Sequence, residues 1–428
     1  MKESFLLTLR GLVRGKVLFL LLGAIAFIHW MLPGLVRSDG SAAGALEMYM
    51  RAVPGAVSAV VQLTVLSVAC GLFAGEREEK RLALTLTRPV SALAVAIGKW
   101  LAMIVLAALA MSFSAVLLAC FPPSAAGGRP PACRHHYAPS LPPPEVAAES
   151  ILDHYLHRPD TPEAIKKASR SAVLTILTTK ELDRYDVVKP GESMAWPYEV
   201  DALKEKMASN EPLSLLVRFS TQFSMRSPVA GNLTLGAYSA VVSNNTQSYI
   251  EIPLSAKEGT AHGGPLELRF ANTGRDTVML RPRRDLEVLA PADSFWWNML
   301  RAHIEVLSLA SLLAAYGIFL SASLSRPVAI FTAAASLAVV MMAPSVIVQF
   351  PNEFNATFAD KIGLAISRCV QAATSSISTP SPVADLATGR AIEWGALMRI
   401  LAGNVVVLPI ALLALSAFIA RRKPLADK

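Results

Sequence analysis

The chain has 428 residues, of which 53% are hydrophobic and only 17% are charged, and its mean hydropathy is +0.44. Soluble globular proteins carry about a quarter charged residues, so this composition excludes an ordinary soluble protein and indicates a polytopic membrane protein. The formal net charge of +8 does not indicate nucleic-acid binding, because the basic residues gather at the ends of apolar runs rather than along one polar face.

The N-terminal segment Lys2–Lys16 has apolar residues at helical spacing with arginines on the other side, which predicts an amphipathic helix at the membrane interface. Val17–Val36 is longer than the apolar core of a signal peptide and predicts an uncleaved first span. Trp30 suits the aromatic belt near its outer end. We expect a short outer loop over Arg37–Val53 and a second span over Pro54–Phe73, with its proline at the helix start.

The charged segment Gly75–Lys99 separates two apolar runs that are each long enough to cross a bilayer. An ionised side chain at the bilayer centre costs about 3 kcal/mol even on a lenient insertion scale, so this segment must form a loop in water. Short loops rich in lysine and arginine are retained on the cytoplasmic side. The loop should therefore be cytoplasmic, which fixes the orientation of both neighbouring spans.

Within this loop, Glu76–Leu86 predicts one short helix across the membrane surface, with acidic residues in its first turn. Arg88-Pro89 ends it, because the residue before a proline is disfavoured in helical geometry. A new helix should follow and become the third span, from Leu93 or Trp100 to Phe121. A short surface helix between two spans is suited to being pushed by a soluble partner. The alternative is a solvated loop whose charge only sets the topology.

The composition changes after the third span. Residues 122–144 are rich in proline and predict a linker without packed structure, and Glu145–His157 and Pro162–Tyr185 predict two helices. The apolar period then becomes two in six short runs: Leu213–Phe219, Leu233–Val242, Ser248–Leu254, Leu266–Phe270, Thr277–Leu280 and Leu286–Leu289. Six strands predict a β-sandwich between the third and fourth spans, outside the cytoplasm by parity.

Trp296 and Trp297 mark the return to the membrane, and Val306–Leu324 is long enough for a fourth span. Glu305 is expected at the outer boundary of this span, within reach of Arg301. The alternative is an acidic residue inside the span, which would be a functional candidate.

A tight turn at residues 325–327 leads to a fifth span over Val328–Phe350. A second outer segment follows from Pro351 to about Trp394, with a short amphipathic helix near Ile362–Val370. The sixth span, Leu397–Ala420, ends at a basic cluster that again marks the cytoplasm. Six spans place both termini in the cytoplasm.

These elements predict a polytopic α-helical membrane protein with six transmembrane helices and an inserted extracytoplasmic α+β domain built as a β-sandwich. We expect an N-terminal membrane half over residues 1–121, which includes the charged loop 75–99. The extracytoplasmic domain should occupy residues 122–295, and a C-terminal membrane half should occupy residues 296–428.

The motifs of common enzymes are missing from the sequence, which contains no G-x-x-x-x-G-K-[ST], G-x-S-x-G or H-E-x-x-H. If the chain moves a substrate uphill, the energy source must lie on another chain, and we expect neither enzymatic activity nor a cofactor bound here. The four cysteines include no C-x-x-C pair, so neither a disulfide framework nor a zinc ribbon is indicated. A bridge between Cys133 and Cys369 stays open if both lie outside the cell.

One group of residues has the composition of a metal site: Cys133, His135, His136, His154 and His157. Two histidines three residues apart on a helix can reach one metal ion, and neutral imidazoles suit zinc or copper. The proline-rich setting, without a neighbouring carboxylate to orient the imidazoles, favours the alternative of a solvated histidine patch.

Polar residues inside the predicted spans are candidates for lining a transport path. Ser58 and Gln62 lie on one face of the second span, and Thr332 and Ser336 lie on one face of the fifth. Serine and threonine in spans also pack helix against helix, which is the alternative for these positions.

The segment F-A-G-E-R-E-E-K-R-L-A-L-T-L-T-R-P-V-S-A-L-A-V-A-I-G-K, residues 73–99, resembles the ABC-2 type permeases, the six-span membrane subunits of ABC exporters. Their pattern has an acidic and basic segment leaving span two, then L-x-R-P-V-S-x, then G-K opening span three. The run Ser325–Ala329, the interfacial helix and the six-span plan agree with it. The resemblance covers about the first 120 and, more loosely, the last 130 residues, whereas the middle departs from the simple family plan.

The resemblance implies that Glu76–Leu86 is a coupling helix that docks in a groove of a separate cytoplasmic ATPase subunit, which binds ATP and magnesium. It implies coupling roles for Glu76, Arg77, Glu78, Glu79, Lys80, Arg81, Leu82 and Leu86. It further implies two permease copies, identical or related, in the bilayer of a bacterial cytoplasmic membrane. The outer domain would gate the exit or contact an envelope protein.

Two other functions compete with the exporter subunit. One is a membrane-anchored sensor or scaffold whose β-domain binds a ligand while its spans transport nothing. The other is a metal-handling protein that uses the histidine patch. A Walker-motif ATPase encoded next to this chain would favour the exporter.

Overall fold

The structure is a computed structural model, and it describes residues 1–35, 42–78, 91–120, 132–158, 161, 166, 170–209, 211–221, 229–244, 249–256, 266–349, 362–363, 365 and 382–422. The chain divides into two compact units. The helical unit consists of Met1–Ala132, Ser294–Val346 and Ala365–Lys428. The β unit consists of Cys133–Asp293 and Ile347–Leu364 and contains the strands β1–β11.

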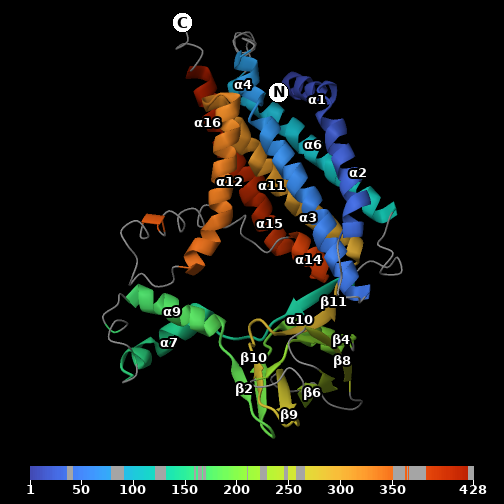
Figure 1. Ribbon diagram of the computed structural model, residues 1–428, viewed down its shortest axis with the longest axis vertical. Coiled ribbons are helices and arrows are strands. Elements are labelled where there is room, and N and C mark those ends of the chain that lie inside the picture. Colours follow the sequence, from blue (N-terminus) through green and yellow to red (C-terminus); the bar gives the residue numbers. More distant parts are fainter. Residues whose placement is uncertain are drawn as a thin grey trace. The chain divides into compact units, whose positions relative to one another are not determined.

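The helical unit is built from long apolar helices and a few short ones (Figure 1). Its elements are α1 (Lys2–Arg14), α2 (Val17–Leu35), α3 (Ala42–Ala69), α4 (Leu72–Glu78), α6 (Ala92–Cys120), α11 (Phe295–Ser323), α12 (Arg326–Gln349), α14 (Pro382–Thr388), α15 (Trp394–Leu401), the π-helical η2 (Ala402–Val407) and α16 (Leu408–Arg422).

Five helical stretches are long and apolar enough to cross a membrane: Val17–Leu35, Ala45–Glu78, Ala92–Cys120, Phe295–Ser323 and Trp394–Arg421. They confirm the prediction of a helical membrane protein. The expected fifth span corresponds to α12, whose described apolar part, Arg326–Val340, is shorter than these five. The described residues thus establish five helices of spanning length, and a sixth span stays a prediction.

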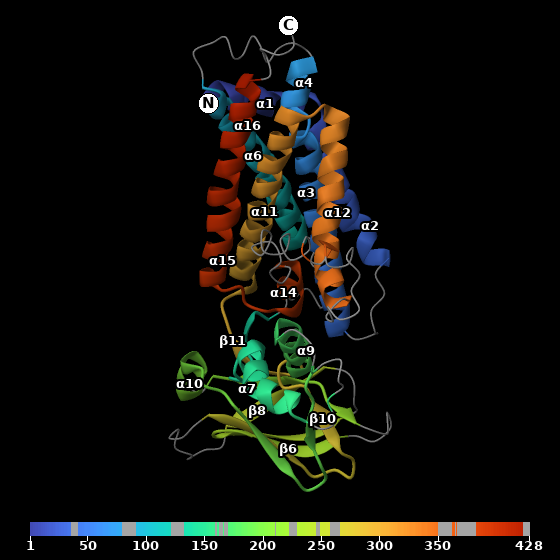
Figure 2. The ribbon, with the colours of Figure 1, turned by 90° about the vertical axis from the view of Figure 1, so that its left-hand side faces the viewer.

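The helix α11 is the centre of this unit and packs along α3, α6 and α16 (Figure 2). Small residues on its surface allow close approach, because membrane helices gain most of their association from tight packing. Its Val306, Ala310 and Ala314 share one core cluster with α3 and α6, contributed there by Val57, Val61, Val65, Met103 and Leu106.

The two ends of the helical unit differ in the helix termini and in the exposed tryptophans that lie there. The N-terminal helix α1, the end of α4, the start of α6 and the end of α16 gather at one end (Figure 1). Exposed tryptophans lie at the opposite helix ends: Trp30 near the end of α2, Trp296 and Trp297 at the start of α11, and Trp394 at the start of α15. Tryptophans in such a belt mark a membrane–water interface.

Three expectations about the second span and the segment after it are wrong. The helix α3 begins at Ala42, so much of the expected outer loop is helical, and Pro54 lies inside the helix rather than at its start. Tertiary packing explains this, because Tyr49, Met50 and Val53 are buried in one cluster with residues of α11 and α14. At its other end the span breaks at residues 70–71 and continues as α4, so Glu76 lies in the second turn of a helix that begins at Leu72 rather than in the first turn of a new one.

The β unit contains two antiparallel sheets. Its strands are β1 (Arg134–Tyr137), β2 (Asp186–Val188), β3 (Ser193–Pro197), β4 (Leu213–Val217), β5 (Ser220–Thr221), β6 (Val229–Leu235), β7 (Tyr238–Asn244), β8 (Ile250–Ala256), β9 (Glu267–Asn272), β10 (Val278–Leu280) and β11 (Leu286–Pro291). Eight strands form a curled sheet in the order β1-β11-β4-β8-β7-β6-β9-β3, and a smaller sheet has the order β2-β10-β5.

The large sheet bends where β7 meets β8, because among the described residues of these two strands only Tyr238↔Ala256 and Ser239↔Ser255 pair. Residues from both halves of this sheet and from β2 and β10 form one hydrophobic core. Alternation produces this core: in β6, Val229, Gly231, Leu233 and Leu235 are buried, and the residues that alternate with them are not. The β-rich insert is therefore confirmed as a separate β region, in the form of a curled sheet with a small second sheet.

Among the described residues, three helices complete the β unit: α7 (Pro144–Leu156), α9 (Arg170–Leu182) and α10 (Asp201–Ala208). The first two were expected and pack together through a small apolar cluster. The strands β1, β2, β3 and β5 and the helix α10 were not expected, and β1 lies in the segment predicted to lack packed structure. The predicted strand Leu233–Val242 is instead a hairpin, since Gly236 adopts a φ of 54° between β6 and β7.

A polar joint at the end of the second span as candidate functional site

The break between α3 and α4 places a short helix against the end of α11. The first backbone N–H groups of any helix lack partners within it. In α4, the N–H groups of Phe73 and Ala74 both donate to Oγ of Ser321 on α11, at 2.8 and 2.9 Å. Ser321 is fully buried, so its hydroxyl caps a neighbouring helix and ties α4 to α11.

Arg77 strengthens the same contact from the other direction. Its guanidinium donates to the carbonyl oxygens of Ala322 at 3.3 Å and Leu324 at 2.5 Å, at the end of α11. These carbonyls have no partner within their own helix, and a positive charge is favourable at the negative end of the helix dipole. The two helices thus exchange caps, one in each direction.

Lys99 connects α4 to α6. Its Nζ lies 2.5 Å from Oε1 of Glu76, donates to the carbonyl of Leu72 at 3.1 Å and lies 5.0 Å from the ring centre of Phe73. Lys99 is only 2% exposed, whereas Glu76 is 34% exposed. A buried ammonium is costly unless it is paired and hydrogen-bonded, and here one carboxylate, one carbonyl and one ring surround it.

Close backbone contact adds to these polar contacts. A Cβ atom added to Gly317 of α11 would lie 2.7 Å from the Cβ of Ala69 and 3.1 Å from the carbonyl oxygen of Leu66, both on α3. Beside the break, the side chain of Arg326 at the start of α12 lies against Gly71. We define the polar joint as Leu72, Phe73, Ala74, Glu76, Arg77, Lys99, Ser321, Ala322 and Leu324.

The predicted coupling residues fall into three groups. Glu76 and Arg77 point into the joint, whereas Glu78 at the end of α4 is exposed. The remaining predicted coupling residues, Glu79, Lys80, Arg81, Leu82 and Leu86, lie outside the described residues. The structure therefore gives the first two a packing role inside the helical unit.

The predicted path-lining residues form hydrogen bonds within their own helix or with the neighbouring helix. Nε2 of Gln62 donates to Oγ of Ser58 at 3.1 Å within α3. Ser336 of α12 accepts a hydrogen bond from the hydroxyl of Tyr316 on α11 at 2.9 Å. Among the described contacts of these two pairs, no hydrogen bond joins one pair to the other.

The histidine group is divided between a strand and a helix. His135 and His136 lie on β1, and His136 pairs through Nδ1 with Glu287 of β11 at 2.7 Å. His154 and His157 lie at the end of α7, and His157 contacts the carbonyl oxygen of its own helix at Asp153. No group of three or more His, Cys, Asp or Glu suited to a metal ion occurs among the described residues. The Cys133–Cys369 pair involves Cys369, which lies outside them.

Two buried charged residues of α11 were expected at its outer boundary. Arg301 and Glu305 are 6% and 8% exposed within the helical unit. Arg301 donates to the carbonyl of Ile392 at 3.1 Å and its guanidinium lies 4.9 Å from the ring centre of Trp394. The start of the last span is thus held to α11 by a charged side chain, near the tryptophan-rich end.

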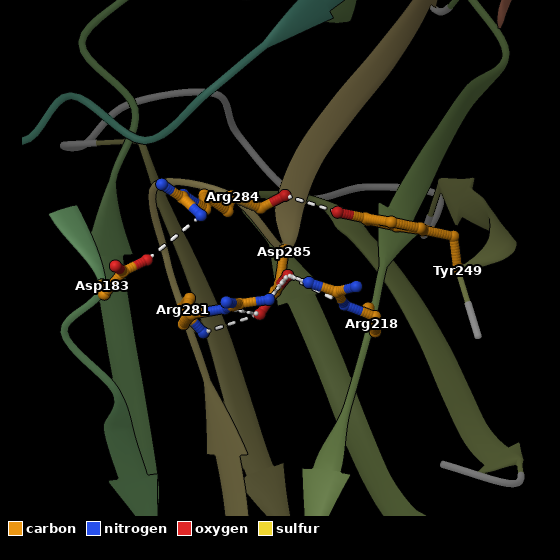
Figure 3. A network of polar contacts seen from close by, with 6 residues as sticks. All are labelled: Asp183, Arg218, Tyr249, Arg281, Arg284 and Asp285. Atoms are coloured by element: carbon orange, nitrogen blue, oxygen red, sulfur yellow. Dashed lines mark hydrogen bonds and ion pairs between the residues drawn. The ribbon is translucent and has the colours of Figure 1, made fainter. Parts of the chain in front are cut away.

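The β unit contains a second polar network, at the turn between β10 and β11 (Figure 3). The fully buried carboxylate of Asp285 accepts hydrogen bonds from Arg218 at 2.6 and 3.0 Å and from Arg281 at 2.9 Å. Arg284 pairs with Asp183 at 3.1 Å, and its carbonyl accepts from the hydroxyl of Tyr249. Because the carboxylate is enclosed by its two arginines, this network fixes a turn.

Sequence reasoning missed the partners of the joint. Ser321 and Gly317 stand in an apolar run where small residues are common, so nothing local separates them from their neighbours. Lys99 did carry a signal, since it is a charged residue in the eighth position of an otherwise apolar helix.

The fold and the joint define a helical membrane protein with a separate antiparallel β region. The sequence matches no family model, no curated protein and no solved structure.

Proposed function

We propose that this chain is the membrane-spanning permease subunit of an ATP-driven ABC exporter, with ATP hydrolysis supplied by a separate ATPase subunit. The observation that carries the proposal is the polar joint. One short helix, α4, precedes the charged residues 79–90 and is bonded to both α6 and α11. A force applied after Glu78 would reach three long helices together.

The joint is suited to transmitting displacement, because its contacts are buried, directional and short. Charge-assisted hydrogen bonds are stronger in a medium of low dielectric constant than in water. A movement of α4 therefore either carries α6 and α11 with it or breaks these contacts, and buried polar groups without hydrogen-bond partners cost free energy. Packed interfaces of this kind switch between discrete arrangements rather than deforming continuously.

The contacts of the polar joint reduce the number of residues on which an ATPase could dock. Glu76 and Arg77 are engaged with α6 and α11, so we assign docking to Glu78 and to the segment from Glu79 to Leu86. In the full assembly, two permease copies would face each other above two ATPases that bind ATP and magnesium.

The proposed location is a bacterial inner membrane, with both termini in the cytoplasm. Basic residues of α1, Arg77 and Arg326 gather at one end of the helical unit, and the exposed tryptophans mark the other. By the positive-inside rule the basic end faces the cytoplasm. The β unit follows α6, which ends at the tryptophan end, so it would lie outside.

The experiment is co-purification of the full chain with the ATPase encoded beside it. Reversal of both Lys80 and Arg81 to glutamate should weaken the association at least tenfold and leave membrane insertion intact. The control is Lys189→Glu, an exposed lysine of the β unit, which should have no effect. Unchanged association in the loop variant would contradict the docking role.

The alternative function, a sensor or scaffold, is supported by a cavity in the β unit. A cavity of about 620 Å³ opens where β7 and β8 diverge, and its lining is neutral: Asn232, Leu233, Thr234, Ser239, Ala240, Val241, Ile252, Pro253 and Ser255. Its volume lies in the range of small-molecule sites. A chain that never associates with an ATPase and binds a ligand here would fit this alternative.

A further inference from the structure

The helix α1 carries a group of positive charges that no ion pair with a described residue neutralises. Arg10, Arg14 and Lys16 are exposed, and none forms an ion pair within the described part of the chain. The two arginines lie one helical turn apart on the same side of α1, and the lysine follows in the turn that leads into α2.

The opposite side of α1 is firmly packed, which fixes the direction in which these charges point. Oγ of Ser4 donates to the carbonyl of Val95 on α6 at 3.1 Å. A Cβ atom added to Gly98 of α6 would lie 2.7 Å from the carbonyl oxygen of Met1. Leu12 is buried in the core shared by α2 and α6. The helix therefore cannot rotate to hide its arginines.

Exposed apolar side chains lie next to the charges on the same helix. Leu6 is 37% and Val13 is 39% exposed, and helical spacing places both between the packed side of α1 and its two arginines. An apolar sector beside a basic one is the pattern of a helix in the plane of a membrane, where the first enters the acyl region and the second meets headgroups.

The backbone at Lys16 supplies an independent observation. Lys16 has a φ of 59°, whereas the neighbouring Gly15, which could adopt positive φ without strain, has a φ of −72°. A left-handed conformation costs a residue with a Cβ atom about 1 kcal/mol, and such strain is kept mainly where the side chain is used. The chain thus holds a lysine, rather than a glycine, at the corner beside the arginines.

We propose that Arg10, Arg14 and Lys16 form a binding site for the phosphate headgroup of an anionic phospholipid, with Leu6 and Val13 against its acyl chains. The site needs only the membrane and does not depend on the exporter proposal. Because α1 is bonded to the first turns of α6, which carry Lys99, a bound lipid would also brace the polar joint.

Native mass spectrometry of the detergent-solubilised full chain tests the proposal, with dioctanoyl phosphatidylglycerol and dioctanoyl phosphatidylcholine as probes. The wild type should bind the anionic lipid more tightly. Arg10→Gln, Arg14→Gln and Lys16→Asn should each lower that affinity about fivefold. This factor corresponds to the attraction of about 1 kcal/mol between one basic residue and an anionic membrane surface. The preference should also weaken as salt is added.

Two comparisons separate binding from folding. Lys2→Gln removes a charge from the far end of α1 and should leave the lipid preference unchanged. Asparagine tolerates positive φ, so Lys16→Asn should retain the melting temperature of the wild type in phosphatidylcholine. A triple variant with an undiminished preference for phosphatidylglycerol would overturn the proposal. Displacement of phosphatidylglycerol by inorganic phosphate at the same concentration would also overturn the proposal, because the site would then bind free phosphate rather than a lipid.

Discussion

Glu76 and Lys99 lie 2.5 Å apart and join α4 to α6 across 23 residues of sequence. Lys99 is almost completely buried, so the pair is a structural element of the helical unit and not a surface contact. Removing one partner of a buried pair leaves an uncompensated charge, whereas exchanging both for apolar residues is often neutral.

Glu76→Gln should therefore lower the free energy of unfolding by about 3 kcal/mol, and Lys99→Met in the same chain should restore most of it. The measurement is unfolding of the full chain in mixed micelles, arranged as a double-mutant cycle. Additive losses for the two substitutions would show that the two side chains do not depend on each other.

Ser321→Ala should destabilise the helical unit by about 2 kcal/mol, because the buried N–H groups of Phe73 and Ala74 both lose their acceptor. Ser416→Ala is the matched control, since Ser416 is equally buried but donates only to the carbonyl of Leu413 in its own helix. Equal losses for the two variants would argue against capping across helices.

Gly317→Ala should force α3 and α11 apart and cost about 1 to 3 kcal/mol, as overpacked cores do. Gly23→Ala of α2 is the control, because nothing lies within 4 Å of an added Cβ atom there. Thermal unfolding in one detergent compares the two. If Gly317→Ala melts at the temperature of the control, the close contact with Ala69 and Leu66 is not a constraint.

Tyr198 should make the β unit sensitive to alkali. Burial raises the pKa of its hydroxyl, and the nearby negative charge of Glu287 raises that pKa further. The folded state therefore favours the neutral phenol, so its contribution to stability is complete below the unfolded pKa, about 10, and is lost as pH rises toward the folded value. The loss should appear in unfolding measurements of the full chain above about pH 10.

Tyr198→Phe should remove part of this alkaline loss. It should also raise the stability at neutral pH by about 1 kcal/mol, because the buried hydroxyl has no hydrogen-bond partner among the described residues. A variant with the same pH profile as the wild type would show that another group titrates.

The apolar spans and most strands could be predicted because their signals are local. A run of about 20 apolar residues has few alternatives, and the alternation in β4, β6 and β9 is clear within each strand. The unexpected strands β1, β2, β3 and β5 carry no such signal. The first of them, in a proline-rich stretch, forms because it pairs with β11, more than 140 residues away.

The joint could be predicted only in part, for the same physical reason. The charges of Glu76, Arg77 and Lys99 are visible in the sequence and indicate a functional segment. Their partners are not visible, because Ser321 caps residues 247 and 248 positions earlier in the chain. Arg77 contacts the end of α11, and its expected role toward an ATPase stays a prediction.

Topology can be examined separately with single cysteines in a background that carries Cys120→Ser and Cys369→Ser. Val241→Cys, on the exposed side of β7, should react with an impermeant maleimide in intact spheroplasts. Ser325→Cys, at the basic end of the helical unit, should react only after permeabilisation. The reverse pattern would place the β unit inside the cell.

The central claim is that a separate ATPase moves this bundle through the segment that follows α4. The most direct measurement places a photo-crosslinking amino acid at Leu82 in the full chain, produced together with the ATPase of the neighbouring gene. The account predicts a cross-link to the ATPase whose yield changes when ATP is added to the membranes. The account would be contradicted if residue 82 never cross-linked to the ATPase. It would also be contradicted if residue 82 and residues of the β unit were labelled from the same side of the membrane.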